Sequence, residues 1–193
     1  MHIIETDRLR LQLMTLEFFD FCLAGDREAA ERLAGVSIAD DWLAESGYVK
    51  MRREQLAADP SYGPWCVRMI VLKAANRMIG QIGFHTPSDS PGLRGIAPGA
   101  IEFGYRIYEP NRRKGYAKEA AIGLMRWAAA EQGIASFVVS IAPHNAASQA
   151  MAKSLGFVKV GEQMDEADGL EDVLVLNGDA LGKFISSRDE LSN

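Results

Sequence analysis

The sequence predicts an α+β domain built on a mixed, mostly antiparallel central sheet that is flanked by helices. Three observations support this fold class. The chain of 193 residues is long enough for one well-buried domain. Its hydrophobic fraction of 48% and its charged fraction of 24% are ordinary for a globular protein. Its patterns run in the order strand, helices, three strands, helix, strand, helix and two strands, which is typical of α+β folds.

The first third of the chain contains one strand pattern and two helical stretches. Residues 7–13 alternate polar residues with leucine, which is the period of a strand with one buried face. Between residues 15 and 33 the apolar spacing suits helices, with a break near Gly25. A second helical stretch is expected over residues 41–58, because the prolines and the glycine of residues 59–64 end it.

The middle of the chain predicts an antiparallel hairpin and a long loop. Strand-like runs at residues 65–72 and 77–85 are separated by a short connection. Gly80 and Gly83 weaken the second run, and they indicate a bulge or a backbone that approaches closely. Residues 86–99 form a turn-rich loop of a length that more often carries a function.

Strands and helices alternate through the rest of the chain. A strand at residues 100–108 is stopped by Pro110, and a helix follows over residues 117–131. A buried strand is expected at residues 136–142 and a helix at residues 145–155. The remaining expected elements are a strand pair at residues 157–164 and 171–177, and a short polar helix within residues 179–193.

Charge and composition argue against several classes of function. The net charge of −5 and the pI near 5.3 give no support for direct binding to nucleic acid or to an anionic membrane. No apolar run approaches the roughly 20 residues of a membrane span, and the charged N-terminus does not resemble a secretory signal. We therefore expect a cytoplasmic protein in which Cys22 and Cys66 are reduced core residues.

A basic loop precedes the helix expected at residues 117–131. Arg112, Arg113 and Lys114 stand beside Gly115 in an otherwise acidic protein. The first amides of a helix have no partner within the helix, and they lie at the positive end of its dipole. A glycine also lets a ligand approach the backbone closely. The loop is therefore a candidate site for an anion such as phosphate, the alternative being a solvated surface loop.

The motifs around this loop carry a family resemblance. Arg112, Gly115 and Ala117 fit the pattern (Q/R)-x-x-G-x-(A/G), whereas the patterns GxxxxGK(S/T) and GxGxxG are absent. Asn145 and Ser148 follow the next strand, and the sequence Leu-Gly-Phe closes their helix. This combination resembles the acyl-CoA-binding core of the GNAT N-acetyltransferase superfamily. The opening TDRLRL and the Pro-Trp pair before the second strand are similar to the RimJ/RimL-type branch, which acetylates ribosomal-protein N-termini.

The resemblance covers roughly residues 6–177 and implies a GNAT core there, within a single domain of residues 1–193. Residues 178–193 would form a short C-terminal extension. The implied co-substrate is acetyl-CoA, with no metal. In the family, loop amides hold the pyrophosphate, and the pantetheine arm pairs with a strand where the sheet splays open. The cofactor-binding residues implied in this way are Ile107, Tyr108, Arg112, Arg113, Lys114, Gly115, Tyr116, Ala117, Asn145 and Ser148.

Acetyl transfer to an amine needs a donor to the oxyanion and an acid for the departing thiolate. The resemblance implies a backbone N–H near Ile107 or Tyr108 as the oxyanion donor. Many GNAT enzymes carry an acidic tyrosine seven residues after the asparagine, where this chain has Ala152. Ser148 is the implied replacement, and its alternative role is a hydrogen bond to its own helix backbone.

The base that accepts the proton of the amine has several candidates. Glu102 is the first, because a carboxylate on the cofactor-binding strand can deprotonate an ammonium group directly or through water. The alternative for Glu102 is an ion pair with Arg106 or with a neighbouring strand. His85, at a strand end beside the long loop, is a further candidate. Glu119 lies in the first turn of the helix after the basic loop, where the dipole favours acidic residues, and is interpreted as structural.

The acceptor and two competing functions stay open. An α-amino group with a pKa of about 8 is partly neutral at pH 7, whereas a lysine of about 10.4 is almost wholly charged. The lack of an obvious strong base therefore favours a protein N-terminus or a small-molecule amine, acetylated by direct attack in a ternary complex. The alternatives are a catalytically inactive acyl-CoA-binding module and a structural or partner-binding domain. The oligomeric state is open, a homodimer included.

Overall fold

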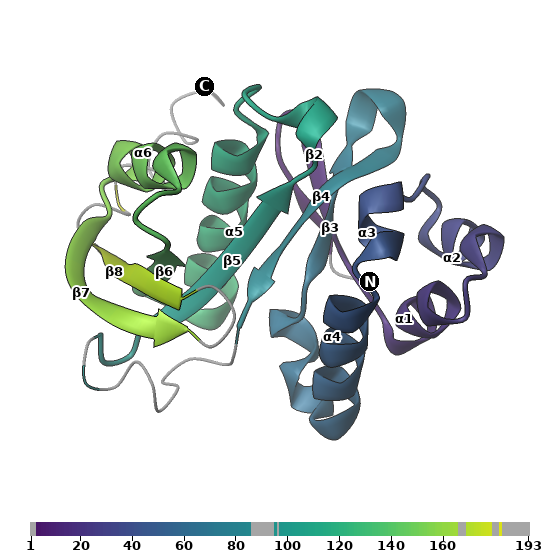
Figure 1. Cartoon of the computed structure of the whole chain (residues 1–193), viewed down its shortest axis with the longest axis horizontal. Coiled ribbons are helices and arrows are strands. Elements are labelled where there is room, and N and C mark those ends of the chain that lie inside the picture. Colours follow the sequence, from purple (N-terminus) through teal and green to yellow (C-terminus); the bar gives the residue numbers. More distant parts are fainter. Residues whose placement is uncertain (1–2, 86–94, 96, 166–168, 179–181, 183–193) are drawn as a thin grey trace. The chain divides into compact units, whose positions relative to one another are not determined.

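The computed structural model describes residues 3–85, 95, 97–165, 169–178 and 182 (Figure 1). The chain forms two compact units. The first unit comprises residues 1–84 and 105–124, and the second unit comprises residues 85–104 and 125–193. Strand β5 (Ile101–Ile107) and helix α5 (Tyr116–Gln132) are each divided between the two units.

The sheet of the first unit places its strands in the order β1, β2, β3, β4 and the C-terminal part of β5. The bounds of the first four strands are β1 (Ile3–Glu5), β2 (Leu9–Leu13), β3 (Arg68–Leu72) and β4 (Arg77–Phe84). These four pair antiparallel with their neighbours. The alternation of residues 7–13 is confirmed as β2, in which Leu9 and Leu11 are fully buried. Strand β1 was not predicted, because its 3 residues are too few to show a period.

Four helices gather on one side of β2–β4 in Figure 1. Their bounds are α1 (Leu16–Leu23), α2 (Arg27–Ala34), α3 (Asp40–Ala44) and α4 (Ser46–Ala58), and a 3₁₀ turn follows at Pro60–Trp65. The break predicted near Gly25 is confirmed, since Gly25 has a φ of 74°. The stretch predicted as one helix divides at Glu45 into α3 and α4. Phe18, Trp42 and Tyr62 are among the large side chains that fill the core between these helices and the sheet.

Strand β4 carries the irregularity that its two glycines predicted. The register between β3 and β4 shifts beside Gly80. A Cβ atom on Gly80 would lie 2.1 Å from the carbonyl oxygen of Arg106, and one on Gly83 would lie 2.6 Å from the Cα of Val67. Both positions therefore need glycine because another backbone approaches closely, as predicted.

The sheet of the second unit places the N-terminal part of β5, β6, β8 and β7 in that order. The bounds of its elements are β6 (Ser136–Ile141), α6 (Ala146–Leu155), β7 (Val158–Asp165) and β8 (Gly169–Asn177). Strands β5 and β6 are parallel, and the other pairs are antiparallel. The predicted α+β class with a mixed, mostly antiparallel sheet is thus confirmed.

The parallel ladder between β5 and β6 is short. It pairs Ile101 with Phe137 and Glu102 with Val138. Strand β6 continues to Ile141 and remains paired with β8 there. The described ladder therefore joins β6 to the first two residues of β5 only.

Two predictions fall mainly outside the described residues. The loop at residues 86–99 is described only at residues 95 and 97–99, and the helix predicted within residues 179–193 only at residue 182. Across the described parts of the chain, no helix combines the length and the apolar character needed to cross a membrane.

Candidate active site

The loop between β5 and α5, in the first unit, presents a row of unpaired amides. Arg113 and Gly115 adopt left-handed backbone conformations, with φ of 61° and 80°. Among the described residues, none accepts a hydrogen bond from the amides of residues 113–117, and the first bond into the helix runs from the Glu119 N–H to the Gly115 carbonyl at 3.1 Å. Successive N–H groups around left-handed residues form a concave anion site. The loop therefore has the backbone geometry of an anion site, and phosphate as its ligand stays a prediction.

Two of the basic side chains hold the loop itself. The Nε of Arg112 donates to the carbonyl of Ile107 at 2.8 Å, and the Nζ of Lys114 donates to the carbonyl of Pro110 at 2.9 Å. The amide of Arg112 also donates to the carbonyl of Glu109 at 3.2 Å. Arg112 is thus occupied at both backbone and side chain, so the open amides begin at Arg113 rather than at Arg112.

Arg8, which the sequence analysis did not single out, fastens the loop from the turn before β2. Its Nη1 donates to the carbonyl of Lys114 at 3.0 Å, and its guanidinium lies 4.6 Å from the ring centroid of Tyr116. Its Nε and its backbone N–H donate to Glu119 at 2.6 and 2.7 Å, and the Thr6 hydroxyl donates to the same carboxylate at 2.6 Å. The structural interpretation of Glu119 therefore holds.

The ionisation of Glu119 follows from these contacts. Burial raises the pKa of its carboxyl group, but the hydrogen bonds from Thr6 and Arg8 and the charge of Arg8 outweigh burial. The pKa of Glu119 is therefore lowered, and the group is an anion at neutral pH.

Of the two predicted oxyanion donors, one is already engaged. The N–H of Tyr108 donates to the carbonyl of Ile79 at 3.0 Å, and its ring is fully buried with its hydroxyl 3.4 Å from the Oε1 of Gln81. Burial, first of all, raises the pKa of this hydroxyl. The N–H of Ile107 is therefore the remaining donor for the role that the resemblance implies.

In the second unit, Glu102 lies at the centre of a polar cluster. Its Oε1 accepts a hydrogen bond from the Ser140 hydroxyl at 2.5 Å, and Gln163 donates to that hydroxyl oxygen at 2.8 Å. Its Oε2 lies 3.5 Å from the Nδ1 of His85. Burial raises the pKa of Glu102, but the contacts with His85 and Ser140 lower it by more than burial raises it. The pKa is therefore lowered, and the carboxylate is ionised at neutral pH.

Glu102 does not form the ion pair with Arg106 that was considered as its alternative role. Arg106, in the first unit, pairs with Glu45 at 2.7 Å. Glu102 contacts His85, whose Nε2 would lie 2.7 Å from a Cβ atom on Gly104. Gly104 thus leaves room for the imidazole ring over the strand. The Glu102 side chain is 13% exposed and the His85 side chain 44%, so the cluster opens to solvent on the histidine side.

Asn145 and Ser148 lie together at the start of α6, also in the second unit. The Oδ1 of Asn145 accepts from the Ser148 N–H at 3.2 Å, which is an N-cap. Ala152, at the position of the usual tyrosine, is buried at 1% exposure. The Ser148 side chain is partly exposed. Among the described residues, its hydroxyl forms no hydrogen bond with either a side chain or a backbone group. The alternative role for Ser148, a bond to its own helix backbone, is therefore not seen.

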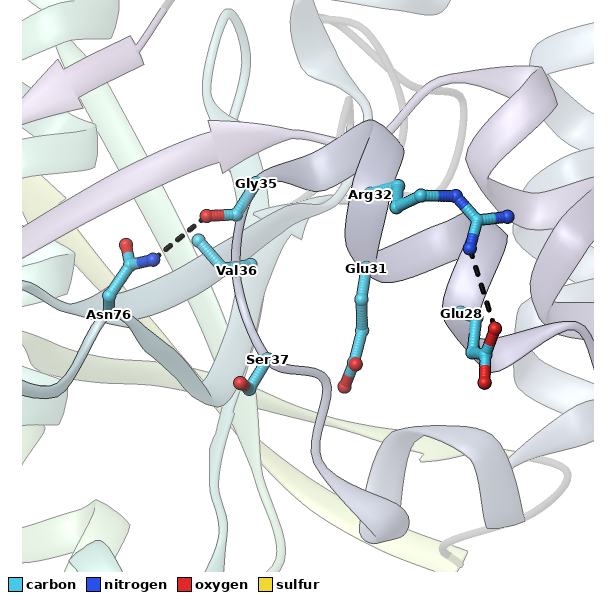
Figure 2. Close-up of a pocket in the computed structure, with 7 residues that line it drawn as sticks. All are labelled: Glu28, Glu31, Arg32, Gly35, Val36, Ser37 and Asn76. Atoms are coloured by element: carbon cyan, nitrogen blue, oxygen red, sulfur yellow. Dashed lines mark hydrogen bonds and ion pairs between the residues drawn. The ribbon is translucent and has the colours of Figure 1, made fainter.

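A separate hollow lies in the first unit, beside α2 and the turn between β3 and β4. Figure 2 shows its lining, in which Arg32 pairs with Glu28 and the Asn76 amide donates to the Gly35 carbonyl at 2.9 Å. The hollow contains none of the predicted site residues. The predicted site residues lie instead in the loop before α5, in the Glu102 cluster and at the start of α6.

The comparison with known families decides what these features belong to. Residues 8–158 match the family described as an acetyltransferase (GNAT) domain. This chain belongs to the GNAT acetyltransferase family. The resemblance identified from the basic loop and the Asn145 helix is therefore confirmed.

This GNAT protein is similar to three further proteins, one in sequence and two in fold. The uncharacterized N-acetyltransferase YjdG of Bacillus subtilis (strain 168) is 28% identical over 160 residues, which cover 82% of this chain and 90% of YjdG. The ribosomal-protein-S5-alanine acetyltransferase of Vibrio fischeri has a TM-score of 0.63 at 18% identity, covering 93% of this chain and 98% of that chain. RimL, a ribosomal L7/L12 alpha-N-protein acetyltransferase in complex with coenzyme A, has a TM-score of 0.61 at 17% identity, covering 93% and 99%.

Proposed function

We propose that this GNAT protein is an N-acetyltransferase that uses acetyl-CoA to acetylate a primary amine. The observation that carries the proposal is the row of amides at residues 113–117, which have no acceptor among the described residues and curve around two left-handed residues. A pyrophosphate supplies the oxygens that such a row needs. The relative crystallised with coenzyme A supports this choice of anion.

Cofactor binding is assigned to the backbone of Arg113, Lys114, Gly115, Tyr116 and Ala117. The Arg112 side chain stabilises the loop through its hydrogen bond to the Ile107 carbonyl. Ile107, Tyr108 and Asn145 keep the pantetheine-binding role that the family resemblance implies. When bound, acetyl-CoA supplies the acetyl group as a thioester, whose thiolate leaves.

Proton transfer from the acceptor is assigned to Glu102 together with His85. The lowered pKa makes Glu102 a permanent anion near neutral pH, which by itself is a weak base. The Nδ1 of His85 lies 3.5 Å from the Glu102 carboxylate, so the imidazole can accept the proton of the amine while Glu102 holds the ring in place. The Glu102–His85 pair can therefore accept the proton of the amine, for which the carboxylate alone is too weak a base.

The other chemical roles fall to a helix residue and a strand amide. Ser148 carries a hydroxyl that can donate a proton to the departing thiolate, and a thiol pKa of about 8.5 means that a weak acid is sufficient. The N–H of Ile107 is assigned to the oxyanion, because the N–H of Tyr108 is engaged by Ile79.

For the acceptor we propose a protein N-terminus or a small-molecule amine of low pKa. No strong base among the described site residues is suited to an ordinary lysine of pKa about 10.4. Two of the similar structures are ribosomal-protein acetyltransferases, and one of these is an alpha-N-protein acetyltransferase. Peptides that carry ribosomal-protein N-termini are therefore the first acceptors to test.

The test is calorimetric titration of the purified protein with acetyl-CoA, alongside Gly115→Asp. The variant adds bulk and a negative charge in the middle of the amide row, so it should lose binding almost entirely. Gly25→Asp is the matched control, because Gly25 has a similar φ of 74° and nothing within 4 Å of its Cβ position. Equal affinity of the wild type and Gly115→Asp would overturn the assignment of the loop.

Turnover separates the enzyme from the alternatives. Binding of acetyl-CoA with no acetylation of any peptide or small amine would indicate an inactive acyl-CoA-binding module. A folded wild type with no affinity for acetyl-CoA would indicate a structural or partner-binding domain.

A further inference from the structure

We propose that Arg8 is a positioning residue for the phosphate-binding loop, and that it works through the Lys114 carbonyl and the Glu119 carboxylate. The inference deepens the proposed function and rests on it. The turn before β2 would then help to position the amides that bind the cofactor. No family motif used in the sequence analysis gave Arg8 this role.

Arg8 contacts the loop by three different means. Its Nε donates to the Oε2 of Glu119 at 2.6 Å, its Nη1 donates to the Lys114 carbonyl at 3.0 Å, and its guanidinium faces the Tyr116 ring at 4.6 Å. Its Nη2 lies 3.4 Å from the position of a Cβ on Gly115. A planar guanidinium can meet all these groups at once because its donors are fixed in a fork, which a lysine ammonium lacks.

The contact with Lys114 sets the direction of an amide. A trans peptide is planar, so its carbonyl and its N–H point in opposite directions. The Lys114 carbonyl shares a peptide with the Gly115 N–H, and Arg8 draws that carbonyl toward the turn before β2. The Gly115 N–H is thereby turned away from Arg8, into the row of open amides. In the next peptide, the Gly115 carbonyl is held by the Glu119 N–H, which orients the Tyr116 N–H in the same way.

The contact with Glu119 resolves an electrostatic conflict. Glu119 is in the first turn of α5, one helical turn from the amides that would bind phosphate, and it is an anion. A carboxylate at that distance opposes the binding of another anion. Arg8 offsets this charge, and the Thr6 hydroxyl and the Arg8 N–H both donate to the other carboxylate oxygen, Oε1. Glu119 can therefore anchor Arg8 without repelling the phosphate.

The two effects of Glu119 predict opposite results for Glu119→Gln, and this gives the sharpest test. If only charge matters, removing a negative charge beside the anion site strengthens acetyl-CoA binding. If Glu119 matters because it positions Arg8, the glutamine weakens binding, since its single acceptor oxygen cannot replace both carboxylate oxygens, which accept from the Arg8 Nε and from the Arg8 backbone N–H. We expect Glu119→Gln to weaken binding about fivefold despite the lost negative charge.

The companion variants are Arg8→Ala and Arg8→Lys, with Arg10→Ala as the matched control. Arg10 is two residues further along the same segment, contacts Asn76 and carries the same charge. Arg8→Ala should raise the Kd for acetyl-CoA about tenfold or more, the effect of a lost charge-assisted hydrogen bond. Arg8→Lys should recover less than half of that loss on a logarithmic scale, and Arg10→Ala should change the Kd less than twofold.

Each measurement is a calorimetric Kd for acetyl-CoA, read beside the thermal midpoint of the same variant. Wild-type affinity in Arg8→Ala, full recovery in Arg8→Lys, or tighter binding by Glu119→Gln would each overturn the positioning role. If Arg8→Ala fails to fold, Arg8→Lys and Glu119→Gln still decide. A folded wild type that does not bind acetyl-CoA would instead refute the proposed function, and the role of Arg8 with it.

Discussion

Glu102 and His85 are joined in the second unit by a backbone hydrogen bond and by a contact between their side chains. The N–H of His85 donates to the carbonyl of Glu102 at 2.9 Å, and the carboxylate of Glu102 lies 3.5 Å from the Nδ1 of the imidazole. The backbone bond fixes the positions of the two residues, and the side-chain contact fixes the direction of the ring. The Ser140 hydroxyl donates to the other oxygen of the carboxylate, and Gln163 donates to that hydroxyl.

Glu102→Gln tests the pair as the proton acceptor. The glutamine keeps an oxygen that can accept from Ser140 but removes the negative charge beside the His85 ring. We expect turnover to fall about 10²- to 10⁴-fold, with the Kd for acetyl-CoA nearly unchanged. Glu131→Gln, an exposed carboxylate on α5, is the control and should keep full turnover. Unaltered turnover in Glu102→Gln would leave Glu102 with a purely structural role.

Ser148→Ala tests the proton donor to the thiolate. If Ser148 is the acid, kcat should fall about tenfold or more while the Kd for acetyl-CoA changes little, because the interaction is made only in the transition state. Ser154→Ala is a matched control on the same helix, since the Ser154 hydroxyl donates to the Met151 carbonyl and is exposed. Equal losses in turnover and in affinity would make Ser148 a cofactor-binding residue instead.

Gly80→Ala tests the close approach between β4 and β5. A methyl group 2.1 Å from the Arg106 carbonyl oxygen cannot fit unless the backbones separate. We expect the free energy of unfolding to fall by about 2–4 kcal/mol, measured by urea denaturation. Gly47→Ala on α4, which has nothing within 4 Å, should instead stabilise the protein by up to about 1 kcal/mol. Equal stability of the two variants would contradict the contact.

The carboxylate of Glu119 predicts an acid-dependent contribution to stability. Its pKa is lowered in the folded state, so its contribution is fully present above the ordinary glutamate pKa of about 4.3. The contribution is lost as the pH falls through the lower folded pKa. The stability difference between the wild type and Glu119→Gln should therefore be large at pH 7 and close to zero near about pH 2. A difference that does not change between these pH values would show that the ionised carboxylate contributes nothing.

Local sequence patterns were sufficient to predict those elements that depend on residues close together in the sequence. The alternation of residues 7–13 predicted β2, and Gly25 predicted the break between α1 and α2. The helix predicted at residues 145–155 is confirmed as α6, and the structure adds that Asn145 is its N-cap. The stretch at residues 41–58 was predicted less well, since nothing local marks Glu45 as the residue at which the helix divides.

The anion loop was also within reach of the sequence. Gly115 beside three basic residues gave the position of the loop, and its left-handed φ is one that glycine adopts without strain. The sequence did not show that the side chains of Arg112 and Lys114 bond carbonyls of the loop itself. Their partners depend on the turn that the chain takes at Pro110, which composition alone does not describe.

The sequence by itself determined the α+β class, the family and the place of the basic loop before α5, because each depends on spacing within short stretches of the chain. The tertiary structure decided which groups act together. Arg8 reaches Glu119 from 111 positions away, and Ser140 reaches Glu102 from 38 positions away. Contacts of this kind leave no period in the sequence, since they form only when separate elements pack into one unit.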